Sequence, residues 1–231
     1  MCLFRRLMMS RRAHPNDVLL GDANNNGRVD VVDIVTTASY ILGNTPATFF
    51  FDAADVNRDG KINITDIVGI ASIILDINTA VNTSSKSSRQ FQPNNRFYIE
   101  DFSMQVGETK TIAINLDNDV SFTGFQADLR LPKGIELCTE DGDYLVDLST
   151  RKGRDHAIGA GDQADESIRI LGYSSGLKVF SSNSGALAYL TLKANDDFTS
   201  EQTITIDNIV FAQPDMTEYI LDATTCVVTK S

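Results

Sequence analysis

The chain has 231 residues, of which 42% are hydrophobic, and a formal net charge of −11. This length holds one large domain or two small ones, and the apolar content is too high for a chain that is disordered throughout. The negative charge argues against a nucleic-acid-binding protein, because a phosphate backbone requires clustered Lys and Arg. An acidic chain is compatible with cation binding, and equally with simple solubility.

Neither a membrane span nor a secretion signal is recognisable. No apolar run reaches the roughly 20 residues that a membrane helix needs. Four arginines interrupt the first twelve residues, whereas a signal peptide needs about 7–15 apolar residues after its basic start. We therefore expect an unstructured segment at 1–14, in a protein that stays in the cell or in a chain without its original N-terminus. Cys2, Cys138 and Cys226 form no disulfide framework, and the last two are compatible with one disulfide or with buried free thiols.

The next part, residues 15–78, contains an internal repeat. The segment G-D-A-N-N-N-G-R-V-D-V-V-D-I-V begins at Gly21, and A-D-V-N-R-D-G-K-I-N-I-T-D-I-V begins at Ala54, so that equivalent residues are 33 apart. A repeat this regular indicates a duplicated structural unit. Each unit continues into a helical pattern that ends, in the first unit, at Gly43. The apolar faces of the two helices are Ile34, Ala38 and Ile41, and Ile67, Ala71 and Ile74.

Each repeat opens with a loop that has the ligand spacing of a calcium site. Ca²⁺ binds roughly six to eight oxygens, which a loop of about twelve residues supplies from positions 1, 3, 5, 7, 9 and 12, with Gly at position 6 for the turn. Gly27 and Gly60 lie at that turn. The predicted ligands of the first loop are Asp22, Asn24, Asn26, the carbonyl of Arg28, Asp30 through a water molecule, and Asp33. Those of the second loop are Asp55, Asn57, Asp59, the carbonyl of Lys61, Asn63 through a water molecule, and Asp66.

One such loop alone would be equally compatible with a polar turn, because Asp, Asn and Gly favour turns anyway. Two copies at a fixed offset, each followed by an apolar helix, favour the binding of two Ca²⁺ ions. Val29 and Ile62 occupy the positions where the loops would form an apolar contact. Because the carboxylates of each loop repel one another without a cation, and so small a domain has little core, we expect chelation to loosen or unfold residues 15–78.

Residues 79–96 form a predicted linker, because the run 82–95 is rich in Ser and Asn and has no periodicity. Residues 97–231 alternate instead with period two. In G-F-Q-A-D-L-R-L, Phe125, Ala127 and Leu129 point to one side, and the residues between them point to the other. Further candidate strands are 97–102, 112–116, 167–174, 186–192, 204–209 and 225–229. Short strands separated by Gly, Asp, Asn and Ser indicate a β-sandwich, and so a multidomain protein with a small α part and an all-β part.

Two other classes of function are compatible with parts of the sequence. A sugar site usually presents aromatic rings, and since the chain has no Trp, its candidates are Tyr144, Tyr173 and Tyr189, the last inside an apolar strand typical of a core. An enzyme would have two histidines as imidazole bases and no G-x-S-x-G motif, while Asp141 and Asp143 lie in a turn-like run that solvation explains. Glycoside hydrolysis needs two carboxylates that flank a cleft, so we expect no catalysis.

The first part resembles a type I dockerin. The resemblance rests on the two loop-plus-helix units and on the text A-A-D-V-N-R-D-G-K-I-N-I-T-D-I from Ala53, with Pro15 and Gly21 leaving no room for a helix that enters the first loop. It implies a small α domain with two half EF-hand loops that docks a protein partner. The contact residues that it implies are Val31, Val32, Ala38 and Ser39, and Ile64, Thr65, Ala71 and Ser72; for Val31 and Ile64, simple packing is an equal alternative.

The second part resembles a cohesin, the usual receptor of a dockerin. The resemblance rests on G-E-T-K-T-I-A-I-N-L-D-N from Gly107, F-T-G-F-Q-A-D-L-R-L-P-K-G-I from Phe122, L-G-Y-S-S-G-L-K-V-F-S-S from Leu171 and D-N-I-V-F-A from Asp207. It implies a nine-stranded jelly-roll sandwich, a fold shared with some carbohydrate-binding modules, so the fold alone does not decide the ligand. The expected partner contacts are exposed side chains of one sheet face, Gln126, Asp128 and Arg130, with Arg169, Leu171 and Tyr173 as further candidates; a merely solvated face is the alternative.

Together the resemblances imply a non-catalytic, calcium-dependent docking protein, an adaptor or scaffold in an extracellular bacterial complex of cellulosome type that degrades polysaccharide. The expected cofactor is two Ca²⁺ ions, and the expected partners are cohesin- or dockerin-bearing proteins, including a second copy bound head-to-tail. The extracellular or cell-surface location follows from the family and from calcium supply. The alternative function is polysaccharide binding by the sandwich. The two domains of one chain could also bind each other, because a short linker gives a high effective concentration.

Overall fold

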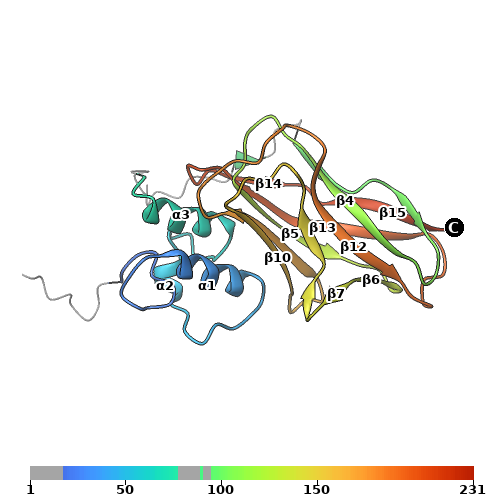
Figure 1. Cartoon of the computed structure of the whole chain (residues 1–231), viewed down its shortest axis with the longest axis horizontal. Helices are drawn as coiled ribbons and strands as arrows, with labels where there is room; N and C mark the ends of the chain where they lie inside the picture. The colour runs from blue at the N-terminus through green and yellow to red at the C-terminus, as the bar shows by residue number, and fades with distance from the viewer. Residues whose placement is uncertain (1–17, 78–88, 91–94) are drawn as a thin grey trace, which may run out of the picture.

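The computed structural model describes residues 18–77, 89–90 and 95–231, which form a small helical part and a β-sandwich (Figure 1). The predicted N-terminal segment and most of the predicted linker lie outside these residues. Within the described part of the chain, no helix is long and apolar enough to cross a membrane.

The helical part contains two equivalent helices, α1 (Val31–Ile41) and α3 (Ile64–Ile74), and a short helix α2 (Phe51–Ala54). Both long helices begin with a capping box, in which the N-cap side chain accepts from backbone N–H groups of the first turn and a carboxylate three residues on accepts from the N-cap N–H. The first helix ends before Gly43, which has a φ of 85°. The second loop is preceded by the single turn of α2, a feature that the repeat pattern did not predict.

The larger sheet has the strand order β1-β14-β13-β5-β11-β10, and β15 joins β13 to β3. Its strands are β1 (Arg89–Gln90), β3 (Phe102–Met104), β5 (Gly124–Arg130), β10 (His156–Asp162), β11 (Ile168–Ser174), β13 (Gln202–Ala212), β14 (Glu218–Leu221) and β15 (Thr224–Lys230). Strand β1 lies inside the predicted linker and pairs in parallel with β14.

The smaller sheet has the order β2-β4-β12-β6, and β9 also pairs with β12. Its strands are β2 (Arg96–Tyr98), β4 (Thr109–Asp117), β6 (Ile135–Leu137), β9 (Val146–Leu148) and β12 (Ala186–Ala194); β7 (Thr139–Glu140) and β8 (Asp143–Tyr144) form a separate hairpin. The β-sandwich is therefore confirmed, although its strands are more numerous than the nine that the resemblance implied, because several edge strands are only two or three residues long.

The sandwich core lies between the two sheets and is rich in aromatic rings. Phe125 is fully buried there, in contact with Phe97 and Phe211 at ring-centroid separations of 5.4 and 5.7 Å. The period-two prediction for β5 is confirmed, since Ala127 and Leu129 belong to the same core. The prediction for Tyr189 was wrong: it alternates with buried neighbours on β12 and faces outward, 39% exposed.

Of the two alternatives for Cys138 and Cys226, a disulfide or free thiols, the structure shows free thiols. Cys226 is buried, and Cys138 is partly buried.

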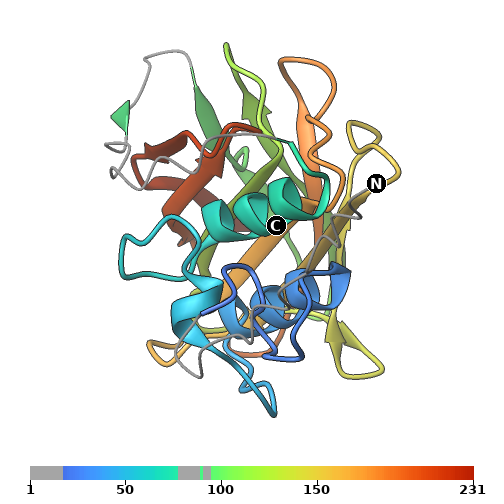
Figure 2. The same cartoon turned by 90° about the vertical axis from the view of Figure 1, so that its left-hand side faces the viewer.

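The helical part rests on the outer face of the larger sheet, in front of the strands in Figure 2. Its own apolar cluster includes residues of α1 and α3 together with Leu171 of β11 and Ala212 of β13. The helical and β parts therefore share one continuous apolar cluster, separate from the core between the sheets.

Candidate calcium loops and docking surface

The first predicted calcium loop is a series of tight turns closed by side-chain oxygens. The two carboxylate oxygens of Asp22 accept from the backbone N–H groups of Asn26 and Gly27, at 2.9 and 2.8 Å. The amide oxygens of Asn24 and Asn26 accept in the same manner from N–H groups two residues on, at 3.0 and 2.9 Å. The chain turns through positive φ at Asn25 (57°) and Gly27 (85°), which brings positions 1, 3 and 5 to one side of the loop.

The second loop repeats this geometry residue for residue. Asp55 accepts from the N–H groups of Asp59 and Gly60, at 3.1 and 3.0 Å. Positive φ recurs at Arg58 (59°) and Gly60 (83°), the equivalents of the two positions in the first loop. Two backbone hydrogen bonds hold the repeats together: Gly21 N–H donates to the Ala53 carbonyl, and the Phe50 N–H to the Ala23 carbonyl, both at 2.8 Å.

The last predicted ligand of each loop couples the loop to the helix behind it. Asp33 accepts from the N–H of Asn24 at 3.1 Å and from the N–H of Asp30 at 2.8 Å, so it joins the start of the loop to the first turn of α1. Asp66 joins Val56 to Asn63 in the same way, at 2.9 and 3.0 Å. A change in either carboxylate therefore reaches both the loop and the helix N-terminus.

The oxygen set fits a hard divalent cation. Asp22, Asp33, Asp55 and Asp66 are all buried, and no ion pair within the described ranges reaches them. The pKa of Asp66 is raised to about 8, chiefly by burial; the backbone N–H groups of Asn63 and Asn57 oppose this rise, and the negative charges of Asp55 and Asp59 add to it. Buried carboxylates without a basic partner are stabilised by a bound cation, and the donors are oxygens throughout.

Carboxylates alone do not complete either site. Counting only His, Cys, Asp and Glu, no group of three or more among the described residues is placed to hold a metal ion. The asparagine amides and the carbonyls of Arg28 and Lys61 are therefore needed to fill a calcium shell of roughly six to eight oxygens. Val29 and Ile62, expected between the loops, are partly buried against the cluster of α1 and α3.

Residues 20–75 match the family described as the dockerin type I domain. This segment is a type I dockerin domain. The resemblance that the two loop-plus-helix units carry is thereby confirmed, and dockerin domains of this type are non-catalytic docking domains.

No curated protein matches the chain. Solved structures similar to its sandwich include a type I cohesin–dockerin complex from Clostridium thermocellum (13% identity, covering 62% of this chain and 100% of that chain, TM-score 0.45). Others are a type I cohesin from Pseudobacteroides cellulosolvens (16%, 62% and 94%, TM-score 0.48) and a non-cellulosomal cohesin from Archaeoglobus fulgidus (13%, 59% and 91%, TM-score 0.45). The surface residues of this sandwich, rather than such a likeness, decide what it can bind.

The predicted partner contacts of the dockerin domain divide into an exposed and a buried set. In the first repeat Val31 and Val32 are 55% and 51% exposed, whereas Ala38 packs inside the helical cluster and Ser39 is half-buried. Their equivalents in the second repeat are all buried: Ile64, Thr65, Ala71 and Ser72. The two repeats are thus alike in backbone, but the first exposes two of these side chains to solvent and the second exposes none.

The sheet residues predicted to be exposed partner contacts are mostly covered or paired. Gln126 is buried beneath the start of α3, and its Oε1 accepts from the N–H of Ile64 at 3.1 Å. Asp128 is buried in a two-pronged ion pair with Arg169, at 2.6 and 2.7 Å. Arg130 bonds Asp207 and Asp165, both at 2.6 Å, and it lowers the pKa of Asp165, after the larger effect of the Ser167 hydroxyl. The expectation of an open polar face was therefore wrong for Gln126 and Asp128.

Several contact residues could not be found by sequence reasoning. Met216 lies in the turn between β13 and β14, and its side chain reaches Gly69 of α3. Leu42, just after α1, lies against Gly159 and Gly161 of β10. No motif marks these residues, because only the packing of two segments distant in the sequence brings them together.

The three tyrosines named for a sugar site do not form one platform. Tyr173 packs beneath the dockerin helices, and burial raises its pKa. Tyr189 faces outward from the smaller sheet, and the hydroxyl of Tyr144 donates to Asp162 at 2.6 Å.

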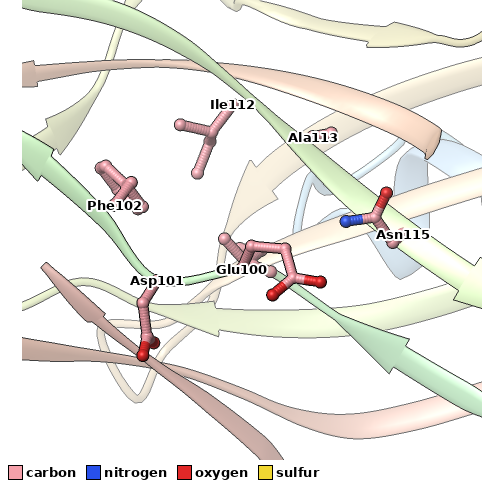
Figure 3. Close-up of a pocket in the computed structure, with 7 residues that line it drawn as sticks. Glu100, Asp101, Phe102, Ile112, Ala113 and Asn115 are labelled. Carbon is pink, nitrogen blue, oxygen red and sulfur yellow. The ribbon is translucent and has the colours of Figure 1, made fainter. Parts of the chain in front are cut away.

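A shallow hollow of about 170 Å³ lies at the edge of the smaller sheet (Figure 3). It is lined by Ile99, Glu100, Asp101, Phe102, Ile112, Ala113 and Asn115. Asp101 already accepts from the N–H of Val227 at 2.7 Å, and the Lys110 ammonium lies 5.9 Å from the centre of the Phe102 ring. The hollow therefore offers one aromatic ring, already approached by a cation, and is a poor site for a pyranose.

Proposed function

We propose that the chain is a non-catalytic adaptor whose dockerin domain binds two Ca²⁺ ions and docks a cohesin-type protein in an extracellular complex that degrades polysaccharide. The observation that carries the proposal is the pair of matched oxygen loops, each tied through its last carboxylate to the helix that presents the docking residues. Calcium would supply positive charge to these buried carboxylates, and thereby set the direction in which α1 and α3 leave their loops.

The residues proposed to hold calcium are those of the two loops. In the first they are Asp22, Asn24, Asn26, Arg28 (carbonyl), Asp30 and Asp33, and in the second Asp55, Asn57, Asp59, Lys61 (carbonyl), Asn63 and Asp66. Asp30 and Asn63 also cap the helices, since their side chains accept from Val32 and Thr65 N–H groups at 2.8 and 2.6 Å. Isothermal titration calorimetry of the intact chain should show two bound Ca²⁺ ions per chain. Absence of any heat at millimolar calcium would overturn the proposal.

The first repeat supplies the proposed surface for the outside partner. Val31, Val32 and Val35 stand next to one another along the solvent side of α1, each more than half exposed. Apolar residues exposed in this manner on a helix are typical of a surface that a partner covers. The matching residues of the second repeat are buried, so we propose the first repeat alone for external docking.

Capture from the secreted fraction of the source organism tests this surface. We expect immobilised chain to retain cohesin-bearing proteins, identified by mass spectrometry, in calcium and to release them in EDTA. Val32→Asp should abolish capture, whereas Val106→Asp, at another exposed valine on the sandwich, should not. Capture that ignores both calcium and Val32→Asp would contradict the proposal, and retention of polysaccharide by the same chain would favour the sugar alternative.

A further inference from the structure

We infer that the outer face of the larger sheet is a receptor surface for the second repeat of the same chain, so that the protein is closed upon itself when calcium is bound. The inference rests on the proposed function for the calcium-held shape of that repeat. It adds the partner of the sandwich, which is neither a sugar nor a dockerin on another chain.

The register of the strands shows what this surface is made of. Residues directly opposite in antiparallel pairs point to the same side of a sheet. Gly124 of β5 is opposite Tyr173 of β11 and Ala212 of β13. The next row of side chains on the same outer face has Gln126 of β5 between Leu171 and Val210. Both rows are apolar or small except for Gln126, and would be an exposed apolar patch without the dockerin domain.

The third row marks where the receptor surface stops. There Asp128 is opposite Arg169 and Asp207, and the charges satisfy one another through Arg169 and Arg130. The sheet face thus changes from apolar to ionic within a few residues along β5. The helices cover the apolar end, because α3 shares a cluster with Leu171 and Ala212.

One polar group in the apolar rows has its partner in the second repeat. Gln126 Oε1 accepts from the N–H of Ile64, the first residue of α3, at 3.1 Å. That N–H has no acceptor within its own helix, because the first four N–H groups of a helix never do. The pair is buried on both sides, so each domain satisfies a polar group of the other.

The sheet also has room where the second repeat approaches. A Cβ placed on Gly124 would lie 2.6 and 2.9 Å from the Cδ1 and Cγ1 atoms of Ile64. The first repeat also reaches this sheet, through Leu42 just after α1: a Cβ on Gly159 would lie 3.0 Å from Leu42 Cδ1, and Gly161 lies against the Leu42 carbonyl. Glycine at Gly124 therefore permits a close approach of the Ile64 side chain, which a larger residue would force to move, and glycine at Gly161 permits the close approach of the Leu42 backbone.

The difference between the repeats follows directly. Ile64 is fully buried on the sheet, while its equivalent Val31 faces solvent. Both come directly after an N-cap in a capping box, so the local backbone does not cause the difference. The sheet covers the start of α3 and leaves the start of α1 open, although Leu42 after α1 also lies against the sheet.

Oxidative footprinting of the full chain in saturating calcium tests the closed state. Met216 is 9% exposed beneath α3, and Met104 is fully buried in the sandwich core as an internal control. We expect Ile64→Asp and the wedge Gly124→Val to raise the oxidation rate of Met216 several-fold. Val31→Asp, at the equivalent position, and Thr111→Val, on exposed β4, should leave both methionines as in the wild type.

Because one variant changes the sheet (Gly124→Val) and the other changes the helix (Ile64→Asp), misfolding of either one alone does not decide the test. Calorimetry of Gly124→Val should still show calcium binding, since its loops are intact. If the wild-type chain itself binds no calcium, the proposed function is wrong, and the closed state has then not been the cause. Sedimentation should give a monomer at every concentration. The inference is overturned if Met216 oxidises as fast in the wild type as in both variants. It is also overturned if Met216 is protected only at concentrations at which the chains dimerise.

Discussion

Asp66 has two tasks at once, as the last oxygen of the second loop and as the acceptor that closes the capping box of α3. Its carboxylate is fully buried and accepts from the N–H groups of Val56 and Asn63. Replacing it removes charge where a cation would sit and weakens the helix start, so in the proposed calcium site this single side chain would link metal binding to helix position.

Asp66→Asn should remove one of the two calcium-binding events. The amide removes one of the negative charges that the second loop offers to the cation, and its NH₂ group faces N–H donors where an acceptor is needed. Titration calorimetry should give one ion per chain in place of two. The matched change Asp76→Asn, at an exposed residue after α3, should leave two. Two ions in Asp66→Asn would remove Asp66 from the ligand set.

Gln126→Met should destabilise the closed chain without changing the sandwich core. Methionine fills a similar volume but accepts no strong hydrogen bond, so the buried N–H of Ile64 loses its partner. An unsatisfied buried donor costs about 1–3 kcal/mol. Urea unfolding in saturating calcium measures the loss, and Gln105→Met, at an exposed residue, is the control. Equal stability of the two variants would mean that the hydrogen bond contributes nothing.

At the scale of elements, α1 and α3 depend on their loops more than on their own sequences. Each has 11 residues, a length at which an isolated helix is marginal in water. The N-cap of each helix is itself a predicted calcium ligand, and the third residue of each helix is a buried aspartate. Without a cation, the carboxylates of each loop repel one another in a part of the protein with little core.

EDTA should therefore unfold or loosen residues 18–77 while the sheets remain. We expect helical signal in circular dichroism to fall and strand signal to stay, with recovery on adding excess calcium. When free calcium is at about 100 times the Kd of a site, its binding contributes roughly 2.7 kcal/mol to the free energy of unfolding, and chelation removes this contribution. Magnesium is the control, because it requires a tighter octahedral shell and keeps its waters. A melting curve that EDTA leaves unchanged would contradict this coupling.

At the scale of the whole molecule, the residues that the structure describes form two apolar clusters, one within the sandwich and one shared by the helical part and the sandwich. The larger lies between the sheets, and the smaller joins α1 and α3 to the outer face of β11 and β13. Because the smaller cluster cannot be complete in either half alone, the stability of the dockerin domain and the covering of the sheet should change together.

Scanning calorimetry checks this coupling. With calcium saturated, we expect the two halves to unfold in one transition; with EDTA, we expect a separate, lower transition for the helical part and a retained one for the sandwich. The shared cluster is the reason, since losing the helices exposes apolar sheet surface. Two independent transitions at the same temperatures in calcium and in EDTA would show that the halves do not stabilise each other.

The sequence by itself determined the local structures and the chemistry of the loops. Oxygen-bearing residues at fixed spacing, glycine at the turn and an apolar period near 3.6 specify a loop and its exiting helix from interactions within about a dozen residues. The alternation of Phe125, Ala127 and Leu129 specified which side of β5 is core in the same local manner. These features needed no knowledge of distant segments.

Only the tertiary structure decided which surfaces are open. Val31 and Ile64 are equivalent in sequence, yet one faces water and the other lies against Gln126 of the sheet, 62 residues later in the chain. Tyr189, set among apolar residues, faces outward, and Gln126, on the side of β5 that the alternation predicts to be polar and exposed, is covered. Exposure depends on which distant segment covers a side chain, and that choice follows from packing between elements, which no local pattern encodes.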